Sequence, residues 1–169
     1  MIIHENNENS INKIVRKINE ATVTQDDLSY VDDLLHYAVN ELTKGMSVKL
    51  VRTQSTVNVI ERIVKFPIKY IGNVTAESSP EDIANALSTF VRKKGHRILD
   101  TYVRKDLEHP YVSVETRCKG EKYEVLGNAY FVFFWDPVSV RYGDPNSIYI
   151  EASIHISDLK RNKVKLVSY

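Results

Sequence analysis

The spacing of apolar residues predicts a helical hairpin at the start of the chain. Between residues 10 and 20, apolar side chains recur three and four positions apart, which is the period of one helix face. A second stripe of this kind runs over 28–42, after a capping sequence that begins at Thr24. Gly45 follows, and a glycine at this place can end a helix in a left-handed conformation. The short link between the two stripes predicts a helical hairpin over residues 10–45.

A third helix is predicted over residues 80–94. Ser79 is a suitable N-cap, and Pro80 takes the first helical position, where its missing N–H costs nothing. Acidic residues follow in the first turn, and lysines precede Gly95 at the other end. Apolar side chains between these ends keep the helical period.

The remaining segments alternate between apolar and polar residues, which predicts strands. Between the second and third helices we expect strands at 46–52 and at 63–71. Pro67 favours an edge position for the latter, because proline cannot donate a ladder hydrogen bond. The segment 56–64 is open to two interpretations, a strand or a short helix.

Beyond the third helix the pattern predicts a run of strands. These are expected near residues 96–105, 110–118, 123–135, 147–156 and 163–168. Residues 119–122 are expected to link the second and third of these strands as a hairpin, and further turn sequences separate the later strands. Successive strands joined by tight links pair antiparallel.

Together these elements predict a single α+β domain over residues 1–169. The helical hairpin at 10–45 and the third helix at 80–94 are expected to pack on a mostly antiparallel sheet built from residues 46–169.

The predicted strand at 123–135 is unusual, because its second half is apolar on both sides. Tyr130, Val132 and Phe134 share one face by parity, while Trp135 ends the other face. A strand that is apolar on both faces needs cover on both. The chain's own helices can supply that cover, or a second subunit can. We treat Tyr130, Val132, Phe134 and Trp135 as candidate interface residues.

Composition restricts the class of protein. The chain has 169 residues, of which 43% are hydrophobic and 27% charged, as in ordinary globular domains. No stretch of 18 apolar residues is present, so no membrane span is predicted. The polar N-terminal segment lacks the apolar core of a secretory signal, and the single Cys118 cannot form an internal disulfide. A cytoplasmic location is expected, or a virion assembled in the cytoplasm.

No cofactor or metal is predicted from the residue spacing. The five histidines lie far apart in the sequence, and Cys118 has no partner cysteine. Glycine-rich phosphate-binding motifs are absent from the sequence, which contains only six glycines.

Two functional alternatives remain open. A phosphodiester hydrolase or nuclease could use Asp100, Glu115 and His155, if the fold brought these side chains into one pocket. A nucleic-acid-associated accessory protein could use the basic clusters at 92–97 and 160–165. The net charge of +1 gives no general support for phosphate binding, and a helix end plus a solvated turn explains both clusters.

The leading hypothesis is a non-enzymatic structural or assembly protein that associates with itself or with a protein partner. It rests on the doubly apolar strand and on ten tyrosines, a residue type that is enriched at protein interfaces. Small α+β subunits of this kind suit ring or tube assemblies, and by analogy we consider a virion component such as a phage head or tail connector.

Overall fold

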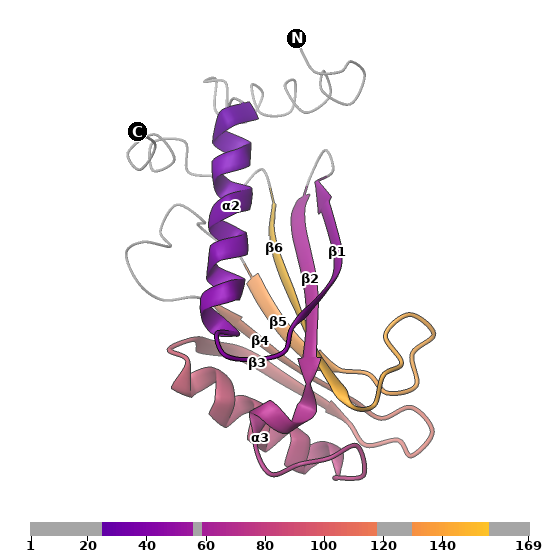
Figure 1. Ribbon diagram of the computed structural model, residues 1–169. Helices are drawn as coiled ribbons and strands as arrows, with labels where there is room; N and C mark the ends of the chain where they lie inside the picture. Colours follow the sequence, from indigo (N-terminus) through magenta and orange to yellow (C-terminus); the bar gives the residue numbers. More distant parts are fainter. Residues whose placement is uncertain (1–24, 56–58, 118–129, 156–169) are drawn as a thin grey trace.

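The computed structural model describes residues 25–55, 59–117 and 130–155. Within these ranges the chain forms α-helices, a short 3-10 helix and a six-stranded sheet (Figure 1). In chain order the elements are α2 (Gln25–Leu42), β1 (Lys49–Ser55), β2 (Val59–Pro67), η1 (Ile68–Ile71), α3 (Pro80–Lys93), β3 (Arg97–Arg104), β4 (Tyr111–Arg117), β5 (Tyr130–Trp135) and β6 (Ser147–His155).

The six strands form one antiparallel sheet in the order β1-β2-β6-β5-β4-β3. The chain builds the β1–β2 hairpin at one edge and then crosses through α3 to β3 at the other edge. From there β4, β5 and β6 return strand by strand, and β6 closes the sheet against β2. This arrangement confirms the predicted α+β class and the antiparallel sheet.

The capping residues of α3 lie where the sequence predicts. The Ser79 hydroxyl accepts a hydrogen bond from the backbone N–H of Asp82 at 3.1 Å, which satisfies one of the orphan donors at the helix start. Beyond the other end, Gly95 adopts a φ of +88°, a conformation that costs glycine little. Both ends of the predicted helix are therefore confirmed.

The prediction of an edge strand containing Pro67 is wrong. β2 lies between β1 and β6, and it spans Val59–Pro67, so residues 59–64 form a strand rather than a helix. Pro67 is nevertheless tolerated, because it lies two residues beyond Lys65, where the pairing with β1 ends. Residues 68–71, predicted as part of the strand, instead form the 3-10 turn η1.

Several predicted elements lie outside the described residues. They are the first helix at 10–20, and with it the helical hairpin, the link at 119–122, the first part of the strand at 123–135, and the last strand at 163–168. The described part of the long strand begins at Tyr130.

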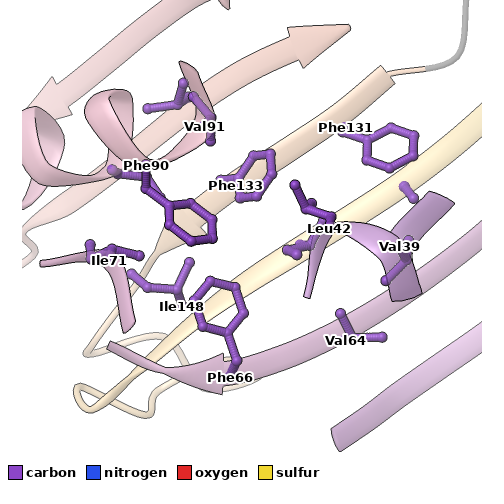
Figure 2. Close-up of a cluster of buried hydrophobic side chains, with 14 of the residues drawn as sticks. Val39, Leu42, Val64, Phe66, Ile71, Phe90, Val91, Phe131, Phe133 and Ile148 are labelled. Carbon is purple, nitrogen blue, oxygen red and sulfur yellow. The ribbon is translucent and has the colours of Figure 1, made fainter. Parts of the chain in front are cut away.

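Both helices cover one face of the sheet, and the main hydrophobic core lies between this face and the helices. α2 contacts β2 and β6, while α3 contacts β3 and β4 (Figure 1). Figure 2 shows Phe90 of α3 facing Phe66 of β2 and Phe133 of β5. The ring centroids of Phe66 and Phe90 lie 5.7 Å apart, and those of Phe90 and Phe133 lie 6.3 Å apart. Burying a phenylalanine side chain stabilises the fold by about 1.5–3 kcal/mol. The helix-covered side is therefore a complete core made by the chain itself.

His96 belongs to this core rather than to a reactive site. Its ring lies 5.4 Å from the ring of Phe131, and its Nδ1 lies 3.2 Å from the Thr116 hydroxyl. That hydroxyl already donates to the carbonyl of Phe131 at 3.0 Å, so the imidazole must donate to it. Burial lowers the pKa of His96 to about 4, and the ring is neutral at physiological pH.

Candidate functional site

The second face of the sheet carries side chains that point away from both helices. We call it the open face. It comprises Glu61, Ile63 and Lys65 of β2, Tyr102 of β3, Tyr111, Glu115 and Arg117 of β4, Tyr130, Val132 and Phe134 of β5, and Tyr149 and Glu151 of β6. No helix in the described part of the chain packs against this face. It is therefore the largest surface of the sheet without a second layer.

An aromatic cluster occupies one end of the open face. Phe134 and Tyr149 are direct neighbours on β5 and β6, and their rings stack with centroids 5.3 Å apart. Tyr142, from the loop 136–146, meets both rings at 5.2 and 5.1 Å. Ile63 and Val132 extend this apolar surface toward the middle of the face.

Hydrogen bonds between the Ser139 side chain and nearby backbone N–H groups hold Tyr142 in place within the loop 136–146. The Ser139 hydroxyl accepts from the backbone N–H groups of Arg141 and Tyr142, both at 3.0 Å. A Cβ at Gly143 would collide with the backbone carbonyl oxygen of Ser139, so only glycine fits this close approach. The loop therefore covers one end of the open face with a single tyrosine and leaves the rest of it uncovered.

A pair of carboxyl groups lies in the middle of the open face. Glu151 is flanked across the sheet by Ile63 and Val132, and its side chain shares a hydrogen bond with Glu61. Burial, and then the contact with the Glu61 carboxyl, raise the pKa of Glu151 to about 7. Arg52 of β1 pairs with Glu61 at 2.9 Å and partly offsets this effect. Glu151 is thus about half protonated near neutral pH.

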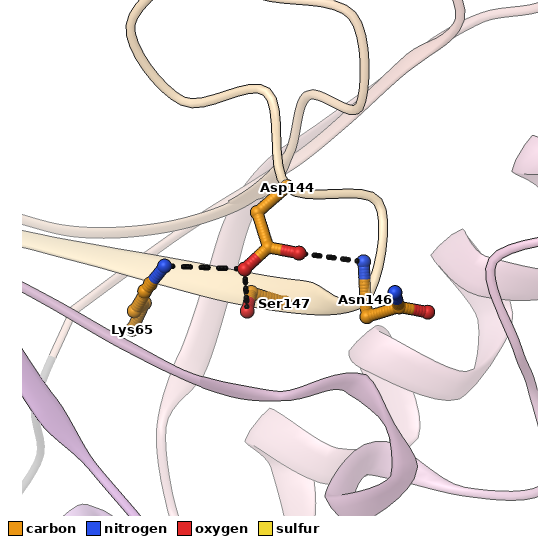
Figure 3. Close-up of polar contacts among 4 residues, drawn as sticks. All are labelled: Lys65, Asp144, Asn146 and Ser147. Atoms are coloured by element: carbon orange, nitrogen blue, oxygen red, sulfur yellow. Dashed lines mark hydrogen bonds and ion pairs between the residues drawn. The ribbon is translucent and has the colours of Figure 1, made fainter.

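A second polar cluster, centred on Asp144, lies at the end of the same face where β6 begins (Figure 3). Asp144 accepts hydrogen bonds from the Ser147 hydroxyl at 2.7 Å, from the Lys65 ammonium at 3.1 Å and from the backbone N–H of Asn146 at 3.1 Å. The hydrogen bonds from Ser147 and Lys65 lower the pKa of Asp144. The hydrogen bond to Asp144 raises the pKa of Lys65, so both groups stay charged. These contacts anchor the loop 136–146 to β2.

The candidate interface residues divide between the two faces. Tyr130, Val132 and Phe134 lie on the open face, with Tyr130 and Val132 partly exposed. Trp135 is only 3% exposed and lies in the helix-covered core, where its indole N–H donates to the Pro145 carbonyl at 2.9 Å. Trp135 is therefore not available to a partner.

The three residues of the hydrolase alternative do not share one location. Asp100 and Glu115 are direct neighbours on β3 and β4. The backbone of His155 lies two strands away from that of Glu115, about 10 Å across the sheet, and four residues beyond Glu151, about 13 Å along it. This separation gives the hydrolase alternative no support.

The structure gives little support to the remaining predictions about nucleic-acid or metal binding. Residues 92–97 span the end of α3 and the start of β3, while the cluster at 160–165 lies outside the described residues. Nowhere in residues 25–55, 59–117 and 130–155 do three potential metal-ligating side chains gather in one place. In the same ranges, no helix has both the length and the apolar character needed to span a bilayer.

Two features of the open face could not be predicted from the sequence. Glu61 and Glu151 are 90 positions apart in the chain, and only the β2–β6 register brings them together. Tyr142 lies in a turn sequence that predicts a loop but not the direction in which the loop folds. The alternation within each strand identifies which residues share a face, but not which strands are neighbours.

Comparison with known proteins adds no functional assignment. No protein-family model matches the chain, and no curated protein is significantly similar to it. The open face is therefore the feature on which a functional proposal rests.

Proposed function

We propose that this protein is a structural or assembly protein that associates with itself through the open face of its sheet. The observation that carries the proposal is the contrast between the two faces. One face is sealed by α2 and α3. The other has no helix of the described chain over it, and it carries the partly exposed Tyr130 and Val132 beside a small buried cluster of Ile63, Phe134 and Tyr149. Contiguous exposed apolar patches on a protein surface often mark interaction sites.

The open face is large enough for a stable interface. Its strands are six to nine residues long. With strands about 4.8 Å apart and about 3.3 Å per residue, the footprint is on the order of 700 Å². A standard protein interface buries about 800 Å² of accessible surface on each partner. The area of the open face is therefore similar to the area that each partner buries in a standard interface.

The charges of the face favour a second copy of the same chain over a strongly charged partner. Basic and acidic groups alternate across it, such as Arg52 beside Glu61 and Arg117 beside Glu115. An isologous interface places the same patch opposite itself, so it needs both signs of charge. Tyrosines at the margin, such as Tyr102 at 49% exposure, supply the amphipathic contacts that are common at interfaces.

Sedimentation equilibrium of the full chain tests this proposal. The wild type should show a mass that rises with concentration from one chain toward two or more. The variant Val132→Gln places an amide at the centre of the open face, and burial without a hydrogen-bond partner should weaken association at least about tenfold. The matched control Val138→Gln changes a valine of the 136–146 loop that is 51% exposed, and it should associate like the wild type.

Two results would contradict the proposal. The first is a wild type that stays a single chain at millimolar concentration. The second is a Val132→Gln variant that associates as strongly as the wild type. The fluorescence of Trp135, which lies in the opposite face's core, reports whether each variant has kept its fold.

A further inference from the structure

A small hollow lies at the edge of the sheet where β1 begins and β2 ends. Its volume is about 180 Å³, and its lining includes Ser47, Lys49, Lys65, Asp144 and Ser147. Sites for drug-sized ligands have volumes of about 300–1,000 Å³, so this hollow suits only a small group. Its lining is rich in hydrogen-bond donors, because it contains two ammonium groups and two hydroxyls.

The two lysines are an unfavourable pair in the absence of a ligand. Lys49 of β1 lies directly opposite Lys65 of β2 in the sheet register. Like charges in directly opposite positions destabilise an antiparallel pair. The β1–β2 register therefore places a repulsive pair beside the hollow.

Only one of these charges is balanced within the described chain. Lys65 pairs with Asp144 at 3.1 Å, and the same carboxylate is occupied by the Ser147 hydroxyl at 2.7 Å. Among the residues that the structure describes, Lys49 has no ion-pair partner. An ammonium has three N–H donors, so Lys65 can contact Asp144 and still donate into the hollow. The lining therefore has one unbalanced positive charge.

We propose that this hollow binds a small oxyanion, a phosphate or carboxylate group, whose oxygens bridge the ammonium groups of Lys49 and Lys65. Such a bridge replaces the repulsion between the lysines by two charge-assisted hydrogen bonds. Asp144 stays in place, because it holds Lys65 and the start of β6 in position (Figure 3). Lys65 belongs to the open face, so the hollow lies at the margin of that face. The proposal does not require self-association.

The test is an NMR titration of the ¹⁵N-labelled full chain with inorganic phosphate, and separately with acetate, at constant ionic strength. The backbone amide signals of Lys49, Lys65 and Ser147 should shift and saturate. Stronger binding of phosphate supports a phosphorylated ligand, and stronger binding of acetate supports a carboxylate. The absence of saturable shifts with either anion would overturn the proposal.

Three variants separate this site from general charge attraction. Lys49→Gln should weaken binding at least about tenfold, because one charge-assisted hydrogen bond is lost. Lys49→Arg keeps the charge and should bind within a few-fold of the wild type. Lys93→Gln removes an exposed lysine from the last turn of α3 and should have no effect. Equal weakening by Lys49→Gln and Lys93→Gln would show non-specific attraction and overturn the proposal.

Discussion

The carboxyl pair in the open face makes the stability of the protein depend on pH in a specific direction. The pKa of Glu151 is about 7 in the folded protein, against 4.5 for a solvated glutamate. The folded state therefore holds its proton more tightly than the unfolded state does. This contribution to stability is fully present below pH 4.5 and is lost as the pH rises through 7.

The substitution Glu151→Gln should remove this loss. Its amide can donate to the Glu61 carboxylate as the protonated acid does, and it cannot ionise. The difference between the two pKa values corresponds to about 3 kcal/mol of unfolding free energy. Glu151 is only half-buried, and solvent screening reduces the effect to about 1–2 kcal/mol. The variant should therefore be more stable than the wild type at pH 8.5 and nearly equal to it at pH 5.

Urea unfolding followed by the fluorescence of Trp135 measures this difference directly, since the chain has a single tryptophan and it is buried. The control is Glu108→Gln, which changes an exposed glutamate in the loop between β3 and β4 and should have no pH-dependent effect. If Glu151→Gln changed stability equally at pH 5 and pH 8.5, or destabilised the protein at pH 8.5, the assigned environment of Glu151 would be wrong.

Three further outcomes are expected. Self-association should weaken as the pH rises from 6 to 8.5, because a second copy on the open face favours protonated Glu151; sedimentation equilibrium would show this, and Glu151→Gln should abolish the dependence. For His96→Gln, urea unfolding at pH 7 and pH 4 should show a pH-dependent difference from the wild type. The unfolding free energy of the wild type relative to the variant should fall by about 2–3 kcal/mol between pH 7 and pH 4, because His96 binds a proton in the unfolded state but stays largely neutral in the folded state. Ser79→Ala should cost about 1 kcal/mol in thermal or urea unfolding through loss of the N-cap, while Thr89→Ala, exposed in the same helix, should cost less than about 0.5 kcal/mol.

Local signals account for the parts of the fold that could be predicted. Ser79, Pro80 and Gly95 define a helix through short-range chemistry, and the structure has that helix. The alternation of residues along β4 and β5 likewise predicts which side chains lie together, because strand parity depends only on the backbone.

The order of the strands depends on long-range packing and was not predictable in the same way. Pro67 suggested an edge strand, but β6 returns from far along the chain to pair with β2. The same pairing creates the Glu61–Glu151 contact, and the β1–β2 register sets Lys49 against Lys65. Patterns in a single sequence carry little information about such pairings, so neither the Glu61–Glu151 contact nor the Lys49–Lys65 pair could be predicted without the structure.

The most direct test of the proposed function is a mixed-label NMR experiment on the wild-type full chain. Half of the chains carry ¹³C-labelled valine methyl groups, and the other half are unlabelled. Intermolecular NOEs should connect the methyl groups of Val132 to the aromatic rings of the open face in the neighbouring copy. If the only intermolecular NOEs came from the surfaces of α2 and α3, or if none appeared at millimolar concentration, assembly through the open face would be contradicted.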